Sequence, residues 1–330
     1  MWNALRALLL AVVLLPVGLL VAVFETLFGP ANRRKKTGHV DSKLAQKRER
    51  RFLKGLGSSP AEFWNTPISY SETRIPKRTG GFRTLHIPSN DLKALQKKIL
   101  KFIELHHGEK VHGCANAYIR GRGVVSNARP HIGCDVLIKL DLKDFFPSVT
   151  RKKVEKWIKF KSAPLELDDP DPGRLKQRLL DILCLDTGLP QGSPSSPLLS
   201  NLVLLDLDRS LSAYAKKYGA KYSRYADDIT FSYVGENKNT VRKTIQSVER
   251  LAQANGFQLN RKRTKQRVLR KHQRQSICGV NLNSGKLTVS RMTRRELRAA
   301  KHKLALGQQA SLTQSQLQGW DAYVKMVGNG

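Results

Sequence analysis

Two adjacent carboxylates at the tip of a short β-hairpin constrain this chain more than any other feature. The segment Tyr225-Ala226-Asp227-Asp228 lies between residues 221–224 and 229–232, two runs with the composition of short strands. Like charges held side by side repel and raise each other's pKa unless a cation is shared between them. Asp is also common in turns, so the pair alone is compatible with an ordinary turn. Its strand context favours a site that binds a cation.

A third carboxylate follows an apolar run upstream. Residues 136–140 have the length and β-branched composition of a strand, and the run ends in Asp141. Beside the hairpin, Asp141 would complete a cluster that can hold two Mg²⁺ ions about 3.5–4 Å apart. Such a pair lowers the pKa of an attacking hydroxyl and stabilises a leaving pyrophosphate, which predicts nucleotidyl transfer. Asp144 is the competing acid, with a helix cap or surface charge as its alternative role.

Three motifs occur in the order and spacing of a reverse transcriptase palm. They are Asp141 with its Phe145-Phe146 pair, the segment 188–197 and the segment 225–228. The chain resembles this family over residues 63–327. The resemblance implies an α+β, right-hand polymerase fold with fingers and palm over residues 63–290 and a short thumb over residues 291–330. It does not cover the N-terminus, where we expect one hydrophobic helix as a membrane anchor (1–30), followed by a basic linker and helix (31–62).

Within that family the chain is similar to the bacterial retron group. Asn127-Ala128-Arg129-Pro130-His131 fits the Asn-Ala-x-x-His signature of those enzymes. Ile277-Cys278-Gly279 stands where they have Val-Thr-Gly, with Cys in place of Thr. The resemblance implies that Asn127, Ala128, His131 and residues 277–279 recognise a cognate RNA. An ordinary structural histidine at a loop-to-strand junction is the alternative for His131.

The same resemblance assigns the catalytic residues. Asp141, Asp227 and Asp228 are the expected catalytic acids and the ligands of two Mg²⁺ ions, and the carbonyl of Leu142 is an expected fourth ligand. A proton donor to the pyrophosphate would be Lys262 or Lys265, or would be absent. Arg263, which stands where related enzymes have Lys, is a poor donor because its pKa exceeds about 12.

Four further residues are expected to bind the incoming nucleotide. Phe146 matches a bulky aromatic under the sugar, where a ring collides with a 2′-hydroxyl; a core Phe is its alternative. Gln191 would lie near the nucleotide, and Gly192 would let the backbone approach closely. Lys77 and Arg83 match cations of the fingers that clamp the triphosphate, although isolated basic residues in so cationic a chain are often surface charges.

Charge independently indicates a nucleic acid partner. The chain has 59 Lys and Arg against 26 Asp and Glu, a formal net charge of +33. Residues 291–303 are expected to form a helix whose basic side chains line one face and follow phosphates. This helix resembles a thumb helix that grips the template–primer duplex through Arg291, Arg294, Arg295, Arg298 and Lys301.

Residues 7–24 carry no charge and are dense in Leu and Val. As a helix they would be about 27 Å long, enough to cross a bilayer core. The basic residues 33–36 follow the tract, so the catalytic body is expected on the cytoplasmic side of the cell membrane. A signal peptide, a buried or partner-binding helix and a mis-assigned start codon are the alternatives; without a span, the protein would be cytoplasmic.

Two long helices and one loop are also expected around the palm. Apolar periodicity predicts helices over residues 195–218 and 240–255, and residues 163–173 are expected to form an acidic, solvated loop.

The leading hypothesis is an RNA-directed DNA polymerase of retron type. It would copy a structured non-coding RNA that serves as template and primer, use dNTPs, and make a DNA product linked to RNA, in antiviral defence and with a possible effector protein. Another bacterial reverse transcriptase lineage, defence-associated or similar to group II introns, is the second reading. A non-catalytic RNA-binding scaffold held at a membrane is the third, and the three carboxylates argue against it.

Overall fold

The computed structural model describes residues 42–77, 80–107, 110–161, 172–235, 238–283 and 285–329. The chain divides into two units, Met1–Asp41 and Ser42–Gly330. The predicted membrane anchor at 7–24 and nearly all of the predicted acidic loop at 163–173 lie outside the described residues. Among the helices that are described, none is long and apolar enough to cross a membrane.

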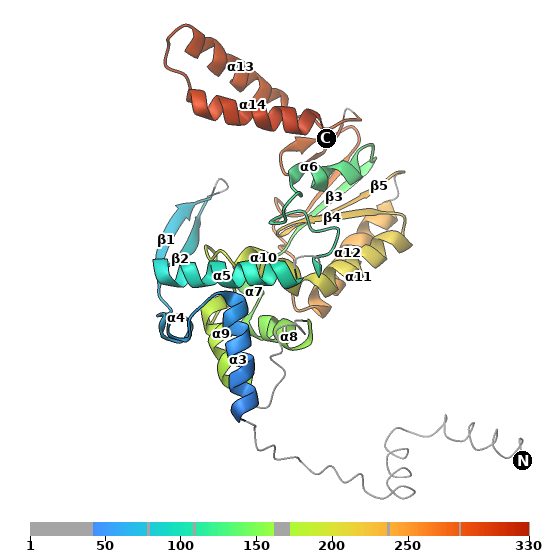
Figure 1. The fold of residues 1–330 in the computed structure, drawn as a ribbon. Coiled ribbons are helices and arrows are strands. Elements are labelled where there is room, and N and C mark those ends of the chain that lie inside the picture. Colours follow the sequence, from blue (N-terminus) through green and yellow to red (C-terminus); the bar gives the residue numbers. More distant parts are fainter. Residues whose placement is uncertain are drawn as a thin grey trace, which may run out of the picture. The chain divides into compact units, whose positions relative to one another are not determined.

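A four-stranded antiparallel sheet forms the centre of the second unit (Figure 1). Its strand order is β4 (Lys221–Tyr225), β5 (Asp228–Tyr233), β3 (Val136–Asp141) and β6 (Arg267–Arg270). The strands predicted on both sides of the carboxylate pair and before Asp141 are confirmed. Strand β3 is almost wholly buried, which accounts for an apolar run that only the half-buried Lys139 interrupts.

Helices α10 (Ser196–Val203), α11 (Leu205–Lys217) and α12 (Lys238–Ala254) follow in the chain and contribute to the main core. The helix predicted over 240–255 is confirmed. The continuous helix predicted over 195–218 is wrong, because the backbone leaves helical geometry at Leu204 (ψ 0°). Leu204 is fully buried, so the apolar periodicity continues across the break and does not reveal it.

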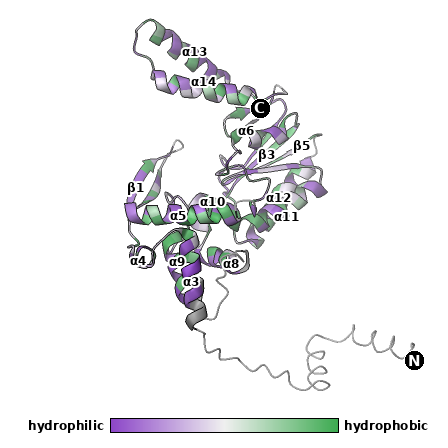
Figure 2. Ribbon diagram, in the orientation of Figure 1, coloured by the Kyte–Doolittle hydropathy of each residue, from purple (hydrophilic) through white to green (hydrophobic). Residues whose placement is uncertain are grey.

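A separate hairpin and a group of helices precede and flank the sheet. The hairpin consists of β1 (Tyr70–Pro76) and β2 (Phe82–Pro88). The helices are α3 (Ser42–Leu56), α4 (Pro60–Asn65), α5 (Asn90–His107), α7 (Phe145–Ser148), α8 (Arg151–Lys161) and α9 (Pro172–Leu183). Hydrophilic residues cover most of α3 (Figure 2). Its Phe52 packs edge-on against Phe63 and Phe102, which ties α3 to α4 and α5.

A second apolar cluster joins the C-terminal elements to the sheet. These elements are the two-residue strands β7 (Ser276–Ile277) and β8 (Val280–Asn281), then α13 (Arg291–Ala305) and α14 (Gln314–Gly328). Val327 of α14 packs in one cluster with Ile277, with Leu137 of β3 and with Ala128 at the end of the short helix α6 (Val124–Ala128). The predicted helix over 291–303 is confirmed as α13, whereas the proposed boundaries of fingers, palm and thumb stay predictions.

Candidate active site

The sheet brings the three predicted acids to one end. In the strand register, Asp141 at the end of β3 faces Asp228 at the start of β5. The Leu142 backbone N–H donates to the Asp227 carbonyl oxygen at 2.9 Å, which holds the end of β3 against the hairpin tip. Residues 87 positions apart in sequence therefore form one carboxylate cluster, as the sequence predicted, and their catalytic role stays a prediction.

The carboxylates of the cluster repel one another. Burial, followed by the charges of Asp228 and Asp141, raises the pKa of Asp227 to about 6. Burial also raises the pKa of Asp228, to which Asp141 adds, while Lys139 opposes the shift. Mutual repulsion of this kind is relieved when positive charge enters the cluster.

Lys265 supplies positive charge in this structure. Its Nζ lies 2.5 Å from Oδ2 of Asp141, and the Asn260 side-chain amide donates to Oδ1 at 3.1 Å. Burial lowers the pKa of Lys265, but the hydrogen bond and the charges of the three carboxylates outweigh it, so the pKa is raised. Within the described residues, no group of three or more His, Cys, Asp or Glu is arranged to hold a metal ion. The oxygen donors fit Mg²⁺ in kind, and Asp141 would become available when Lys265 moves away.

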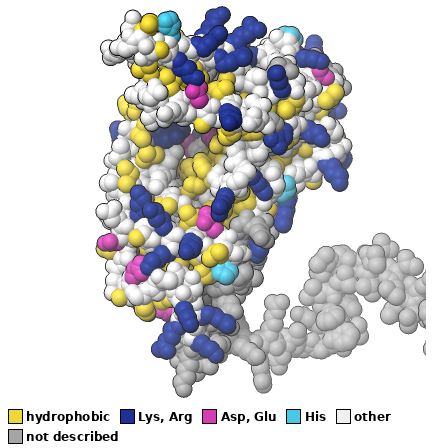
Figure 3. All heavy atoms as spheres, turned by 45° about the horizontal axis from the view of Figure 1, so that its top comes forward, with side chains coloured by type: hydrophobic (Ala, Val, Ile, Leu, Met, Phe, Trp, Pro, Cys, Tyr) yellow, Lys and Arg dark blue, Asp and Glu magenta, His cyan; other side chains and the backbone are white. Residues whose placement is uncertain are grey.

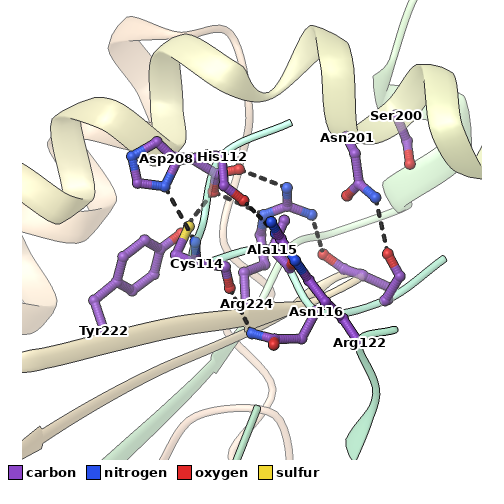
Figure 4. Close-up of polar contacts among 12 residues, drawn as sticks. His112, Cys114, Ala115, Asn116, Arg122, Ser200, Asn201, Asp208, Tyr222 and Arg224 are labelled. Carbon is purple, nitrogen blue, oxygen red and sulfur yellow. Dashed lines mark hydrogen bonds and ion pairs between the residues drawn. The ribbon is translucent and has the colours of Figure 1, made fainter. Parts of the chain in front are cut away.

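A buried ion pair fixes the hairpin tip (Figure 4). Arg224 Nε and Nη2 donate to the two carboxylate oxygens of Asp208 at 2.8 and 2.6 Å, and both side chains are fully buried. Tyr222 also donates its hydroxyl to Asp208, at 2.8 Å. The third donor of Arg224, Nη1, bonds the carbonyl of Ala226 at 3.0 Å. Ala226 has φ 54°, a strained value for a residue other than glycine, so this bond helps to hold the turn that presents the acids.

The predicted nucleotide-binding residues lie on several elements. The backbone carbonyl of Gln191 accepts a hydrogen bond from the backbone N–H of His86 on β2 at 2.8 Å. At Gly192 (φ 130°) a Cβ atom would lie only 2.6 Å from the His86 carbonyl oxygen, so only glycine fits this approach. Lys77 and Arg83 are both exposed on the β1–β2 hairpin. Arg83 opposes the rise in the pKa of Tyr118, described below, and no described contact brings Arg83 or Lys77 to the acids.

The two predicted RNA-recognition segments meet inside the protein. The Asn127 side-chain amide donates to Cys278 Sγ at 3.7 Å, across 151 positions of sequence. The side chains of Asn127, Ala128 and His131 are fully buried and Ile277 is 1% exposed. RNA has no access to these four side chains in this structure. Their role in RNA recognition stays a prediction. These buried residues would affect RNA binding only indirectly, by supporting the surface above them.

His131 links β4 and β5, the two strands of the hairpin that carries Asp227 and Asp228. Its Nε2 lies 2.8 Å from the Ser223 hydroxyl on β4, and its Nδ1 lies 2.7 Å from the Ser232 hydroxyl on β5. Ser223 donates its one hydroxyl proton to the Asn127 carbonyl, so Nε2 carries the imidazole proton and Nδ1 accepts from Ser232. Burial, together with the charge of Lys221, lowers the pKa of His131 to about 4. The imidazole is therefore neutral at physiological pH, and its two hydrogen bonds hold β4 and β5 together.

The basic helix α13 offers its cations to solvent. Arg291, Arg294, Arg295, Arg298 and Lys301 are all exposed, and Lys301 pairs with Asp321 of α14 at 2.8 Å. Lys and Arg side chains are spread over the face shown in Figure 3, with few acids between them. This arrangement is compatible with the predicted phosphate contacts.

Known proteins similar to this chain share one chemistry. The profile of the family "Reverse transcriptase (RNA-dependent DNA polymerase)" matches residues 75–301. The chain is also 30% identical over 247 residues to the retron Ec86 reverse transcriptase of Escherichia coli, covering 74% of this chain and 72% of that protein. The chain belongs to the reverse transcriptase family. Its relatives place it with the reverse transcriptases of bacterial retrons.

Two further relatives of this chain come from Myxococcus xanthus. It is 37% identical over 270 residues to the retron Mx65 reverse transcriptase, with 78% of this chain and 61% of that protein covered. It is 36% identical over 288 residues to the retron Mx162 reverse transcriptase, with 80% and 59% covered. The chain thus spans about three fifths of the length of these two relatives. Its architecture is the right-hand polymerase fold.

Sequence reasoning missed two features of this reverse transcriptase that the structure shows. The pair of Arg224 and Asp208 supports the hairpin tip, and the exposed Tyr118 lies against Phe146. Arg224 stands directly before the catalytic motif, a buried strand position where a charge calls for a buried partner. Tyr118 lies in a segment rich in glycine, and only its backbone conformation distinguishes it.

Proposed function

We propose that this reverse transcriptase is an RNA-directed DNA polymerase of retron type, which copies a structured non-coding RNA into single-stranded DNA. The observation that carries the proposal is the carboxylate cluster at the end of the palm sheet, in a chain that belongs to this family. The retron relatives support the choice of template, and the net charge of +33 supports a nucleic acid partner.

Members of this family generally use divalent metals. Here the proposed ligands of two Mg²⁺ ions are Asp141, Asp227, Asp228 and the Leu142 carbonyl. When bound, the ions would supply charge stabilisation to an in-line displacement at phosphorus. Lys265 is then free to move toward the pyrophosphate, where its protonated amine can donate a proton.

We assign nucleotide selection to residues of the β1–β2 hairpin together with Phe146 and Gln191. Arg83 and Lys77 would bind the triphosphate as exposed cations on this hairpin. Phe146, partly buried beside Phe145 at a ring-centroid distance of 5.2 Å, would exclude a 2′-hydroxyl. The side chain of Gln191 would lie near the nucleotide, and its backbone is held in place by the hydrogen bond from His86. The exposed cations of α13 would grip the template–primer duplex.

Primer extension by the purified protein tests the polymerase. We expect dNTP addition to a primer on an RNA template in the presence of Mg²⁺, and no addition after chelation with EDTA. A protein that binds the RNA but adds no nucleotide under any divalent metal would contradict the proposal and favour the scaffold.

The retron assignment has its own test. Sequencing of the nucleic acid that co-purifies with the protein should recover one structured RNA, joined to DNA through a branch. A heterogeneous pool of cellular RNA would instead favour another reverse transcriptase lineage. The role in antiviral defence and the effector protein remain predictions from the resemblance.

The predicted membrane anchor at residues 7–24 is also part of the proposal. We expect the full chain in the membrane fraction, released by detergent and not by about 1 M salt, which screens binding of a cationic protein to lipid. The matched variant lacks Met1–Pro30 and should leave the membrane fraction. Full-length protein that is soluble, or that salt alone releases, would refute the anchor.

A further inference from the structure

The loop that joins α5 to α6 presents one aromatic side chain toward the active site. Tyr118 is 49% exposed, whereas its neighbours Ala115, Asn116 and Ala117 are buried. It has φ 62°, a left-handed conformation that is unfavourable for a bulky residue. A strained residue persists only when the surrounding contacts determine its conformation, and such residues gather at functional sites.

Buried polar contacts impose this conformation (Figure 4). Arg224 N–H donates to the Cys114 carbonyl and Asn116 N–H donates to the Arg224 carbonyl, both at 2.9 Å, so the loop runs along the strand that carries the catalytic motif. The Asn201 side-chain amide of α10 donates to the Ala117 carbonyl at 2.9 Å. On the other side of Tyr118, Arg122 Nη1 donates to the Ala115 carbonyl at 2.8 Å.

The surroundings of Tyr118 are those of the nucleotide site. Its ring lies 6.3 Å from the ring of Phe146, centroid to centroid, at an interplanar angle of 43°. Burial raises the pKa of the Tyr118 hydroxyl, Asp227 and Tyr225 add to the shift, and Arg83 opposes it. The side chain therefore stands among the proposed sugar-selecting ring, the catalytic acids and a cation of the fingers.

We propose that Tyr118 is a positioning residue for sugar selection, which holds the Phe146 ring in the orientation that excludes a 2′-hydroxyl. The inference rests on the proposed function, because it needs a polymerase that selects deoxynucleotides. Steric exclusion works only if the excluding ring cannot turn away. Phe145 contacts the Phe146 ring on one side, and Tyr118 is the second aromatic contact. Without Tyr118 the ring of Phe146 gains freedom to tilt, and the pocket accepts ribose more readily.

The test compares dNTP and rNTP incorporation as the ratio of their kcat/KM values, so that a general loss of activity cancels. Contacts between aromatic rings correspond to about a three- to tenfold effect, so Tyr118→Ala should lower the ratio by that factor. Tyr118→Phe, which keeps the ring, should retain the wild-type ratio. Tyr118→Gly removes the ring and also relieves the backbone strain, so it covers the case in which the Ala variant folds poorly.

A double-mutant cycle separates positioning from direct contact. In a Phe146→Ala background, Tyr118→Ala should not change the ratio further, because no ring remains to be positioned. The matched control is Tyr218→Ala. Tyr218 is 50% exposed and also contacts one ring, that of Tyr214 at 4.6 Å, on α11.

Each other outcome has a defined meaning. An unchanged ratio in Tyr118→Ala and Tyr118→Gly, or additive effects in the double mutant, would overturn the role of Tyr118. A higher KM for dNTP and rNTP alike would also overturn it and indicate stacking on the base. In all of these outcomes the wild-type protein still synthesises DNA, so the proposed function stands. A wild-type protein that adds no dNTP at all would instead defeat the proposed function itself.

Discussion

Replacement of Asp227 by Asn is expected to lower DNA synthesis at least about 10³-fold and to make the metal-free protein more stable to heat. Asn keeps the shape of Asp and one acceptor oxygen, but it cannot carry the charge that binds a cation. The same charge is unfavourable in the empty cluster, since burial and the neighbouring carboxylates raise the pKa of Asp227 to about 6. Single-nucleotide incorporation and thermal unfolding in EDTA measure the two effects.

The stability gain should depend on pH in a defined direction. The pKa of Asp227 rises from an ordinary 3.8 to about 6 in the folded protein. The stability linked to its proton is thus fully present below about pH 4 and is lost as the pH rises through 6. The Asn variant and the wild type should therefore unfold at similar temperatures near pH 4, and the variant should be the more stable above pH 6.

Asp206→Asn is the matched control. Asp206 is 50% exposed on α11, and Arg209 lies 3.5 Å away, so both activity and stability should stay near wild type. Full activity of Asp227→Asn would contradict the site assignment. A variant that is inactive and also less stable than wild type at high pH would contradict the repulsion within the cluster.

The sequence predicted the elements that local patterns encode. The β-branched run before Asp141, and the short runs around Asp227-Asp228, have strand periodicity, and each is a strand of the palm. The helix of residues 291–303 was predicted because its basic side chains recur at helical spacing. The break at Leu204 was not visible, since a buried leucine satisfies the apolar pattern on either side of it.

Contacts between distant residues could not be predicted in this way. Lys265 reaches Asp141 across 124 positions, and although the sequence named it with Lys262 as a proton donor, no local signal showed that it pairs with Asp141. The Asn-Ala-x-x-His signature suggested contact with RNA, yet both ring nitrogens of His131 form hydrogen bonds inside the protein, to Ser223 and Ser232. The sequence pattern indicated that these residues matter, and only the packing shows that they support the hairpin from inside.

Removal of the buried guanidinium in Arg224→Met should destabilise the protein by about 3–5 kcal/mol, because Asp208 would remain charged without its partner in the core. That loss is a large fraction of the total stability of a typical domain, about 5–15 kcal/mol. The loss is measured by urea unfolding of the wild type and the variant, provided that the free energy of unfolding falls with urea concentration at the same slope in both. Removing both charges, in Arg224→Met with Asp208→Leu, should restore much of the stability, because no unpaired charge stays buried.

Restored stability should not restore activity, and this difference separates support of the fold from support of the site. In the double variant the Ala226 carbonyl still lacks the Nη1 donor that holds the strained turn, so the catalytic acids lose their fixed position. We expect a folded protein with a severely reduced kcat. Arg209→Met is the matched control. It breaks the exposed ion pair with Asp206 on α11, the helix that carries Asp208, and should cost less than about 1 kcal/mol of stability and leave kcat unchanged. A double variant with wild-type kcat would show that the hairpin turn holds the acids without Arg224.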